Sequence, residues 1–285
     1  MKRQKSFENN KPTLFLVPTP IGNLSEMSPR ALEVLNQVDV IACEDTRTSG
    51  TMLKHFNISK KLIAYHNFNE ESSAKGILQL LEEEKNVALI SDAGYPLIND
   101  PGQRVVFEIT EAGYNVVPVS GPSAFLDGLV ASGLVAQPFI FIGFLPQNNT
   151  DRNKKLQLYQ DYPMTMIFYE APHRIKKMLT SCLDILGDRQ CVIARELTKV
   201  HEEFLRGTVS EMIEVSDDLK GEMVIIMDGN HENKKDEIDL SMILNMVQTS
   251  VQAGMSTRDA IKEASLKTGV SKNVIYDAVN ETKRS

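Results

Sequence analysis

The chain of 285 residues contains little cysteine and shows no metal-binding pattern. Its three cysteines, Cys43, Cys182 and Cys191, lie far apart, and no C-x-x-C pair occurs. Neither a disulfide framework nor a zinc knuckle is therefore expected. The five histidines have no spacing typical of a metal site either, so we expect no bound metal.

Long apolar runs and an excess of positive charge are also missing. No apolar stretch approaches the roughly 20 residues that cross a membrane. The polar start, MKRQKSFENNKP, lacks the apolar core of a signal peptide. A cytoplasmic protein without membrane contact is the simplest expectation. The formal net charge of −7 argues against a general attraction to nucleic acid, so an RNA site has to be a local patch.

In the first half of the chain, short apolar runs alternate with helical patterns. Strands are expected at residues 13–17, 38–43, 61–65, 86–91 and 115–120, and helices at 28–37, 70–84 and 102–112. Ser28 followed by Pro29 is typical of a helix start. This alternation predicts a parallel sheet with helices on both faces.

The second half predicts a mixed sheet, because its strands follow one another more closely. They are expected at 138–144, 164–169, 190–195, 222–227 and early in 201–214, where Thr208 and Glu211 form a capping box. The fold class is therefore α/β, with two α/β domains at 13–125 and 126–228.

A polar linker at 229–237 precedes a helical tail, expected at 238–285. Within it, residues 256–280 are typical of a helix–turn–helix, with Thr257 and Ser271 as helix caps and Gly269 ending the first helix.

Polar, glycine and proline residues concentrate directly after the expected strands. The segments are TPIGN, EDTR, SDAGYPLINDPG, SGPSA, GFLP, YEAPHR and RELTK. Because ligands of open parallel sheets bind outside the carboxyl ends of the strands, these segments predict a ligand cleft. Simpler interpretations stay open: Gly and Pro are ordinary turn residues, EDTR fits a local salt bridge, and YEAPHR fits a helix with Pro172 in its first position.

The first of these loops, in LVPTPIGNL, lies where a dinucleotide-binding protein carries its glycines. Glu44 and Asp45 follow about 20 residues later, where an acid that binds the ribose is expected. However, only Gly22 is a glycine, and Thr19 and Pro20 would crowd a pyrophosphate. A nicotinamide-dependent oxidoreductase is thus disfavoured, and Gly22 is expected to supply a permissive turn.

Taken in order, TPIGNL, EDTR, SDAGYPLINDPG, SGPSA, GFLP, YEAPHR, ARELTK and GEMVII resemble the ribosomal RNA small subunit methyltransferase I family. These are 2′-O-ribose cytidine methyltransferases of the tetrapyrrole methylase superfamily. The resemblance covers about residues 13–228, and the tail is similar to the family's helix–turn–helix extension. It implies a homodimer of the tetrapyrrole methylase fold with S-adenosylmethionine between its two domains. It also implies small-subunit ribosomal RNA, or the 30S subunit, as substrate.

The resemblance further implies roles for individual residues. Those expected to bind the cofactor are Pro20, Gly22, Asp92, Ala93, Gly94, Pro96, Ser123, Ala124 and Tyr169. Asp45, Glu170 and His173 are candidates for the base that accepts the hydroxyl proton, and Arg47 and Arg174 are candidates for phosphate contacts. Three positions depart from the family pattern: Tyr95 replaces a threonine, and Asn99 and Ala171 each replace a serine.

Two segments, 150–200 and 254–285, carry a small excess of positive charge, where an RNA-binding face and tail would be useful. Removing residues 231–285 is therefore expected to weaken substrate binding but not cofactor binding. Two other functions stay open: a methylase of a tetrapyrrole or other small molecule, and a non-enzymatic nucleic-acid-binding protein.

Overall fold

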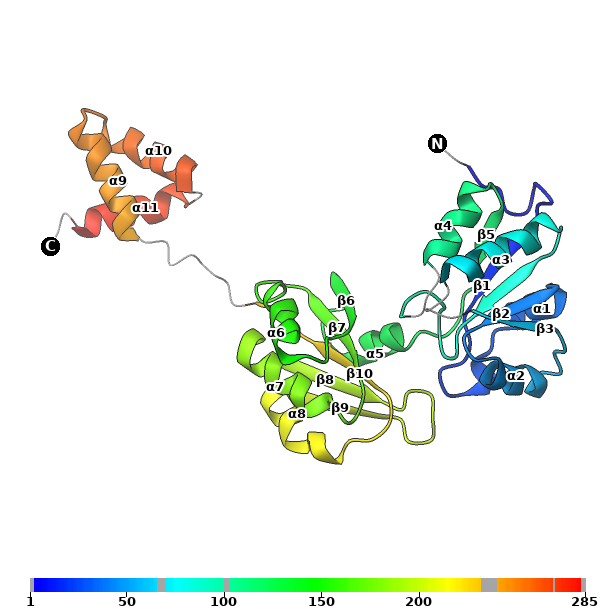
Figure 1. Ribbon diagram of the computed structural model, residues 1–285. Coiled ribbons are helices and arrows are strands. Elements are labelled where there is room, and N and C mark those ends of the chain that lie inside the picture. The colour runs from blue at the N-terminus through cyan, green and yellow to red at the C-terminus, as the bar shows by residue number, and fades with distance from the viewer. Residues whose placement is uncertain (1–2, 66–69, 100–102, 232–239, 269, 283–285) are drawn as a thin grey trace. The chain divides into compact units, whose positions relative to one another are not determined.

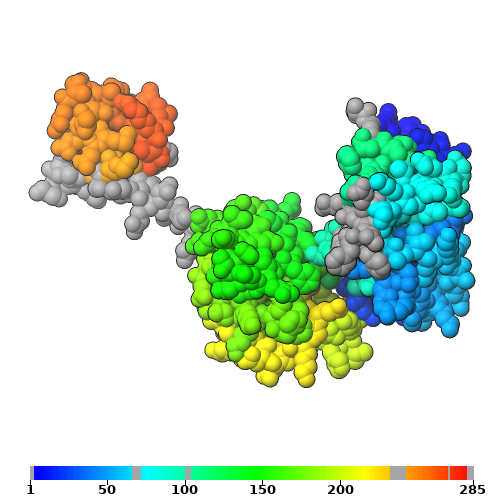
Figure 2. Space-filling model, viewed as in Figure 1, coloured from blue at the N-terminus to red at the C-terminus, as the bar shows by residue number. Residues whose placement is uncertain are grey.

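The computed structural model describes residues 3–65, 70–99, 103–231, 240–268 and 270–282. The chain separates into two compact units, Met1–Gly229 and Asn230–Ser285. Figure 1 labels their elements, and in Figure 2 the atoms of the first unit run from blue to yellow and those of the second from orange to red.

The first unit begins with a parallel sheet of five strands in the order β3-β2-β4-β1-β5. The strands are β1 (Thr13–Val17), β2 (Val40–Cys43), β3 (Lys61–Ala64), β4 (Val87–Ile90) and β5 (Asn115–Pro118). Every pairing in it is parallel. The predicted parallel sheet is confirmed, and all its strands end at the same edge.

Helices cover both faces of this sheet, as predicted. On β2, Ile41 and Cys43 pack with α1 (Pro29–Gln37) and α2 (Thr46–His55). The alternate residues Val40 and Ala42 pack with α3 (Glu70–Glu82) and α4 (Gln103–Glu111), because successive strand side chains point to opposite faces.

The start of α1 follows the sequence closely, because Ser28 Oγ accepts the Ala31 N–H at 3.1 Å. By contrast, α2 was not expected. Its signal is Asp45, whose carboxylate caps the helix by accepting the Arg47 N–H at 2.8 Å.

The second sheet is mixed, as predicted, with the order β6-β7-β10-β8-β9. Its strands are β6 (Phe139–Phe144), β7 (Thr165–Glu170), β8 (Gln190–Arg195), β9 (Glu203–Thr208) and β10 (Met223–Met227). Only β6 and β7 pair in parallel. The carboxyl ends of β6, β7 and β8 therefore share one edge with the amino end of β10.

Helices also cover both faces of this second sheet (Figure 1). One face packs against α6 (Asn149–Gln157), α7 (Ile175–Leu186) and α8 (Val209–Val215). The other packs against α5 (Ala124–Ser132). The predicted capping box of α8 is present, with the Thr208 N–H donating to Glu211 Oε2 at 2.8 Å. The expected helix start at Pro172 is wrong, because α7 begins at Ile175.

Helix α5 connects the two sheets in sequence and belongs to the second by packing. A Cβ built on Gly128 would lie 3.2 Å from Val224 Cγ1 of β10. The expected boundary between residues 125 and 126 falls inside this helix, and the domain bounds stay a prediction.

The second unit contains α9 (Leu240–Gln252), α10 (Thr257–Thr268) and α11 (Lys272–Thr282), packed around a small apolar core. Ser271 caps α11, as expected, by accepting the Val274 N–H at 3.4 Å. The expected cap of α10 is wrong by one residue: Ser256 accepts the Asp259 N–H at 3.1 Å, and Thr257 begins the helix. Gly269 lies outside the described residues. Among the helices that the structure describes, none is long and apolar enough to cross a membrane.

Candidate active site

A cavity of about 670 Å³ lies where the ends of the first sheet's strands face the edge of the second sheet. Its size is typical of small-molecule and cofactor sites. The residues that line it are Ile21, Asp92, Ala93, Gly94, Tyr95, Ile98, Asn99, Ser123, Ala124, Phe125, Phe144, Tyr169, Glu170, Ala171, Pro172, Ala194, Glu196, Leu197, Gly221, Glu222, Met223 and Val224.

On the side of the first sheet, backbone hydrogen bonds join the loops after β1 and β4. The N–H of Thr19 donates to the Gly94 carbonyl at 3.0 Å, and the Gly94 N–H donates back to the Thr19 carbonyl at 3.0 Å. Gly94 has φ +76°, a left-handed conformation that favours glycine. The two loops thus form one wall of the cavity.

Tyr95 ties this wall to the segment that leads into α5. Its hydroxyl accepts the Gly121 N–H at 3.1 Å. Tyr95, one of the residues that depart from the family pattern, therefore holds two cavity loops together through its hydroxyl oxygen.

The amino end of α5 opens onto the cavity. Ser123 stands at the cap position, but its hydroxyl makes no capping hydrogen bond. Ser123 and Ala124 both line the cavity. Since the first N–H groups of a helix lack helical partners and carry partial positive charge, this end suits a carboxylate.

On the side of the second sheet, Glu170 is a buried carboxylate at the end of β7. Its side chain is 1% exposed, and Oε1 lies 3.1 Å from Arg174 Nε. The same oxygen accepts the Ala171 N–H at 2.9 Å. Burial raises the pKa of Glu170, against the opposing effects of the Ala171 N–H and of Arg174. Within the described residues, Oε2 has no hydrogen-bond partner.

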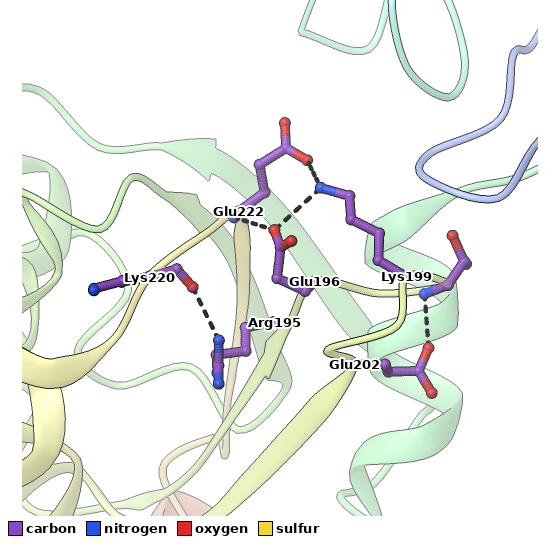
Figure 3. Close-up of polar contacts among 7 residues, drawn as sticks. Arg195, Glu196, Lys199, Glu202, Lys220 and Glu222 are labelled. Carbon is purple, nitrogen blue, oxygen red and sulfur yellow. Dashed lines mark hydrogen bonds and ion pairs between the residues drawn. The ribbon is translucent and has the colours of Figure 1, made fainter.

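Next to it, Glu196 and Glu222 hold one lysine between them (Figure 3). Lys199 Nζ lies 3.1 Å from Glu196 Oε1 and 2.8 Å from Glu222 Oε2. The Glu222 N–H also donates to Glu196 Oε1 at 3.0 Å. Backbone hydrogen bonding with Glu222, followed by Lys199, lowers the pKa of Glu196.

Comparison with known proteins shows the family of this chain. The family model of Tetrapyrrole (Corrin/Porphyrin) Methylases matches residues 13–213. A ribosomal RNA small subunit methyltransferase I of Bacillus subtilis (strain 168) is 42% identical over 98% of this chain and 98% of its own length. The relative of that name from Escherichia coli O157:H7 is 42% identical, over 97% of each chain. The chain belongs to the ribosomal RNA small subunit methyltransferase I family.

The fold of this methyltransferase family is that of the tetrapyrrole methylases. A solved diphthine synthase superposes with a TM-score of 0.57 at 15% identity, covering 76% of this chain and 90% of its own. Members of the family use S-adenosylmethionine, so the expected cofactor and fold class are confirmed. The cavity fits this cofactor in size and chemistry, because the α5 amino end suits the methionine carboxylate, while apolar side chains and the carboxylates of Asp92, Glu170, Glu196 and Glu222 line the rest.

The structure brings most of the expected cofactor-binding residues of this methyltransferase together. Those that line the cavity are Asp92, Ala93, Gly94, Ser123, Ala124 and Tyr169. Tyr169 stacks edge-on against Phe141 and Phe144, at 5.1 and 5.6 Å between ring centroids. Their contacts with the cofactor stay a prediction.

Three other expected cofactor ligands, Pro20, Gly22 and Pro96, do not line the cavity, whereas Ile21 does. Pro20 and Pro96 are buried. The expectation that Gly22 supplies a permissive turn is wrong, because its φ is not positive. Glycine is needed there for space: a Cβ would lie 2.5 Å from Lys199 Cγ.

Asp45 and Arg47 form a local pair away from the cavity lining. Arg47 Nη2 lies 2.8 Å from Asp45 Oδ2, and Nε lies 3.1 Å from Oδ1. The hydrogen bonds of Arg47 lower the pKa of Asp45 to about 2. His173 is exposed and is not part of the lining either. Arg174 binds Glu170 and donates to the Leu145 carbonyl at 2.6 Å.

Sequence reasoning gave no role to Glu196, Lys199 and Glu222. The motif RELTK was noted as a strand end, which was the available signal for the first two. Glu222 stands before a strand rather than after one, so a search of strand ends passes over it, and its available signal was the motif GEMVII.

Proposed function

We propose that this chain transfers the methyl group of S-adenosylmethionine to the 2′-oxygen of a cytidine ribose in small-subunit ribosomal RNA. The observation that carries the proposal is the cavity at the facing sheet edges, with a helix amino end on one side and a buried carboxylate on the other. Near-full-length relatives named for small-subunit ribosomal RNA support the choice of substrate.

This methyl transfer requires alignment of the ribose hydroxyl with the methyl group more than activation of the methyl group. S-adenosylmethionine supplies a methyl group that is already activated by its sulfonium. The protein has to place the ribose hydroxyl in line with that methyl and accept its proton. Ser123 and Ala124 would bind the methionine carboxylate, while Asp92 and Tyr169 would contact the rest of the cofactor.

Glu170 is our choice for the proton acceptor among Asp45, Glu170 and His173. It lines the cavity, and a raised pKa suits a base that works near neutral pH. Arg174 and the Ala171 N–H hold Oε1, which leaves Oε2 for the proton. Arg174 thereby acts as a positioning residue rather than as a phosphate ligand.

The choice of base is tested by single-turnover methylation with saturating cofactor. Glu170→Gln should slow methyl transfer by about 100-fold or more, the usual contribution of a general base. Asp45→Asn and His173→Asn should stay near the wild-type rate. A wild-type rate for Glu170→Gln would remove it from this role, and wild-type rates for both Asp45→Asn and Glu170→Gln would remove both acids.

RNA binding is assigned to the helical tail more than to residues 150–200. Several cations of that segment are already engaged within the protein. Arg152 is 6% exposed and donates to Ser181 Oγ at 2.9 Å, and Lys176 pairs with Asp217. On the tail, Arg258, Lys262 and Lys272 are exposed on α10 and α11.

A charge reversal within the full-length protein tests this assignment. Lys262→Glu/Lys272→Glu should weaken binding to small ribosomal subunits and leave cofactor affinity unchanged. Removal of residues 231–285 should act in the same direction. Unchanged RNA affinity in both proteins would show that the tail is not the RNA-binding part.

The overall proposal also includes a cytoplasmic homodimer, as the family resemblance implies. Light scattering of the purified chain reports its mass, and a monomer at working concentrations would contradict this part. Methyl transfer from labelled S-adenosylmethionine should occur with 30S subunits or free small-subunit RNA. Transfer to porphyrin precursors alone would favour a small-molecule methylase, and digestion to nucleosides would show whether 2′-O-methylcytidine forms.

A further inference from the structure

The loop after β1 meets the β8–β9 loop at Gly22. A Cβ built on this glycine would lie 2.5 Å from Lys199 Cγ, 2.8 Å from Thr198 Oγ1 and 3.0 Å from the Leu197 carbonyl oxygen. The first two separations, both to side-chain atoms, are shorter than a Cβ tolerates, and the third, to a backbone oxygen, is tighter than most Cβ contacts. A side chain at position 22 therefore requires the side chains of Lys199 and Thr198, or one of the two loops, to move.

Both loops form part of the cavity lining, one after a strand of each sheet. Ile21 comes from the first domain and Leu197 from the second, and both line the cavity. The two side chains are 9% and 8% exposed and belong to one apolar cluster. A displacement at Gly22 would therefore change the separation of the cavity walls.

The β8–β9 loop is restricted by its backbone conformation and by a hydrogen bond, so we expect it to move little. Glu196 and Thr198 have φ values of +51° and +67°, which non-glycine residues adopt at a cost. The Thr198 N–H donates to Glu202 Oε2 at 2.7 Å (Figure 3). A strained loop persists only where its surroundings over-determine it, so the loop after β1 is the part that would be displaced.

Lys199 fastens this contact at both ends of its side chain. Its Cγ lies beside the exposed Gly22, while Nζ binds Glu196 and Glu222 on the cavity wall. Burial lowers the pKa of Lys199, but the hydrogen bonds to Glu222 and Glu196 outweigh this effect and raise it. The ammonium therefore stays charged at neutral pH and keeps the stem in place.

We propose that the contact between Gly22 and the stem of Lys199 is a spacer that sets the width of the cofactor cavity. Lys199 is a positioning residue in this arrangement and contributes no proton transfer. The inference rests on the proposed binding of S-adenosylmethionine in this cavity.

The test is titration calorimetry of the full-length chain with S-adenosylmethionine. Gly22→Ala should raise Kd about tenfold, which corresponds to about 1.4 kcal/mol of binding free energy, because the added methyl group would alter the separation of the cavity walls. The matched control is Gly76→Ala in α3, where a Cβ would meet nothing within 4 Å, and its Kd should equal the wild-type value. An unchanged Kd for Gly22→Ala would overturn the spacer.

A double-variant cycle tests the contact itself. Lys199→Ala removes the Cγ atom nearest to position 22, so the loss caused by Gly22→Ala should be at least about threefold smaller in its presence. Strictly multiplicative effects would contradict the proposal. In steady state, Gly22→Ala should raise KM for S-adenosylmethionine and leave kcat unchanged, whereas a catalytic role would lower kcat.

Further variants separate this inference from the proposed function. Ser123→Trp fills the cavity and should abolish cofactor binding; if it binds normally, the cavity assignment itself fails. If Ser123→Trp abolishes binding while Gly22→Ala binds normally, only the spacer fails. If Gly22→Ala does not fold, the Kd values of Lys199→Met and Lys199→Ala for S-adenosylmethionine test the spacer instead. Both should weaken binding, Ala by at least about threefold through loss of the stem, and wild-type Kd values for both would overturn the proposal.

Discussion

The two sheet edges that form the cavity differ in the directions of their strands. The first sheet is parallel, so every segment that follows one of its strands reaches the same edge. In the second sheet, β10 runs antiparallel to β7 and β8 and brings the residues before it, Gly221 and Glu222, to the cavity. The order of strands and loops along the chain therefore identifies the residues of the first edge. For the second edge, the strand pairing must also be known.

The two edges also differ in chemistry. On the first side, backbone groups of Thr19, Gly94 and Gly121 make the defining hydrogen bonds. On the second side, the carboxylates of Glu170 and Glu196 are held by Arg174 and Lys199. Backbone conformation should thus control the first edge and charge should control the second.

The largest expected effect comes from removing a charge at the second edge. Arg174→Met leaves the Glu170 carboxylate, which is 1% exposed, without its cation. The free energy of unfolding at pH 7 should fall by about 1–3 kcal/mol, measured by urea denaturation. Lys176→Met, which breaks an exposed pair with Asp217, is the matched control and should have little effect.

The same variant gives a signed pH dependence. Arg174 lowers the pKa of Glu170 in opposition to burial, so its removal raises that pKa further. A base works only when deprotonated, so the acidic limb of the methylation rate should move to higher pH. If the pH profile of methylation did not move and the variant lost RNA affinity, Arg174 would instead be a phosphate ligand.

The next effect concerns the backbone of the first edge. Gly94→Ala and Gly113→Ala both place a side chain at a left-handed residue, with φ of +76° and +82°. Each should lower the free energy of unfolding by about 1–2 kcal/mol. Only Gly94 lines the cavity, so only Gly94→Ala should also weaken binding of S-adenosylmethionine. Equal cofactor affinities for the two variants would contradict the claim that backbone conformation controls the first edge of the cavity.

A smaller effect is expected at the cap of α2, outside the cavity lining. Asp45→Ala should lower the melting temperature, whereas Asp45→Asn should lower it less because asparagine also caps. The pKa of Asp45 is lowered to about 2 from an ordinary value of 3.8. Its contribution is therefore complete above pH 3.8 and is lost as the pH falls through 2. A difference from wild type that does not shrink as the pH falls through 2 would contradict this account.

The smallest effect is expected for Glu222→Gln. The Glu222 side chain is 79% exposed and its ion pair with Lys199 is open to solvent. Unfolding free energy should change by less than about 0.5 kcal/mol in chemical denaturation. A larger loss would show that this exposed ion pair, like the buried pair of Glu170 and Arg174, supports the fold.

The amino-acid sequence by itself determined the elements whose signals are local. The alternating apolar runs predicted the strands of both sheets, and Ser28, Thr208 and Glu211 marked helix starts that the structure confirms. These signals depend on residues within three or four positions of each other, so no distant partner is needed to interpret them. The ordered loop motifs also indicated the family, since each occurs after a recognisable strand.

Only the tertiary structure decided which of those residues meet. Gly22 looked like a turn residue but makes room for Lys199, 177 positions further along the chain. Glu222 enters the cavity only because β10 pairs antiparallel with its neighbours. Close approach and strand pairing join residues far apart in the chain, and the local pattern of the sequence carries no measure of that distance.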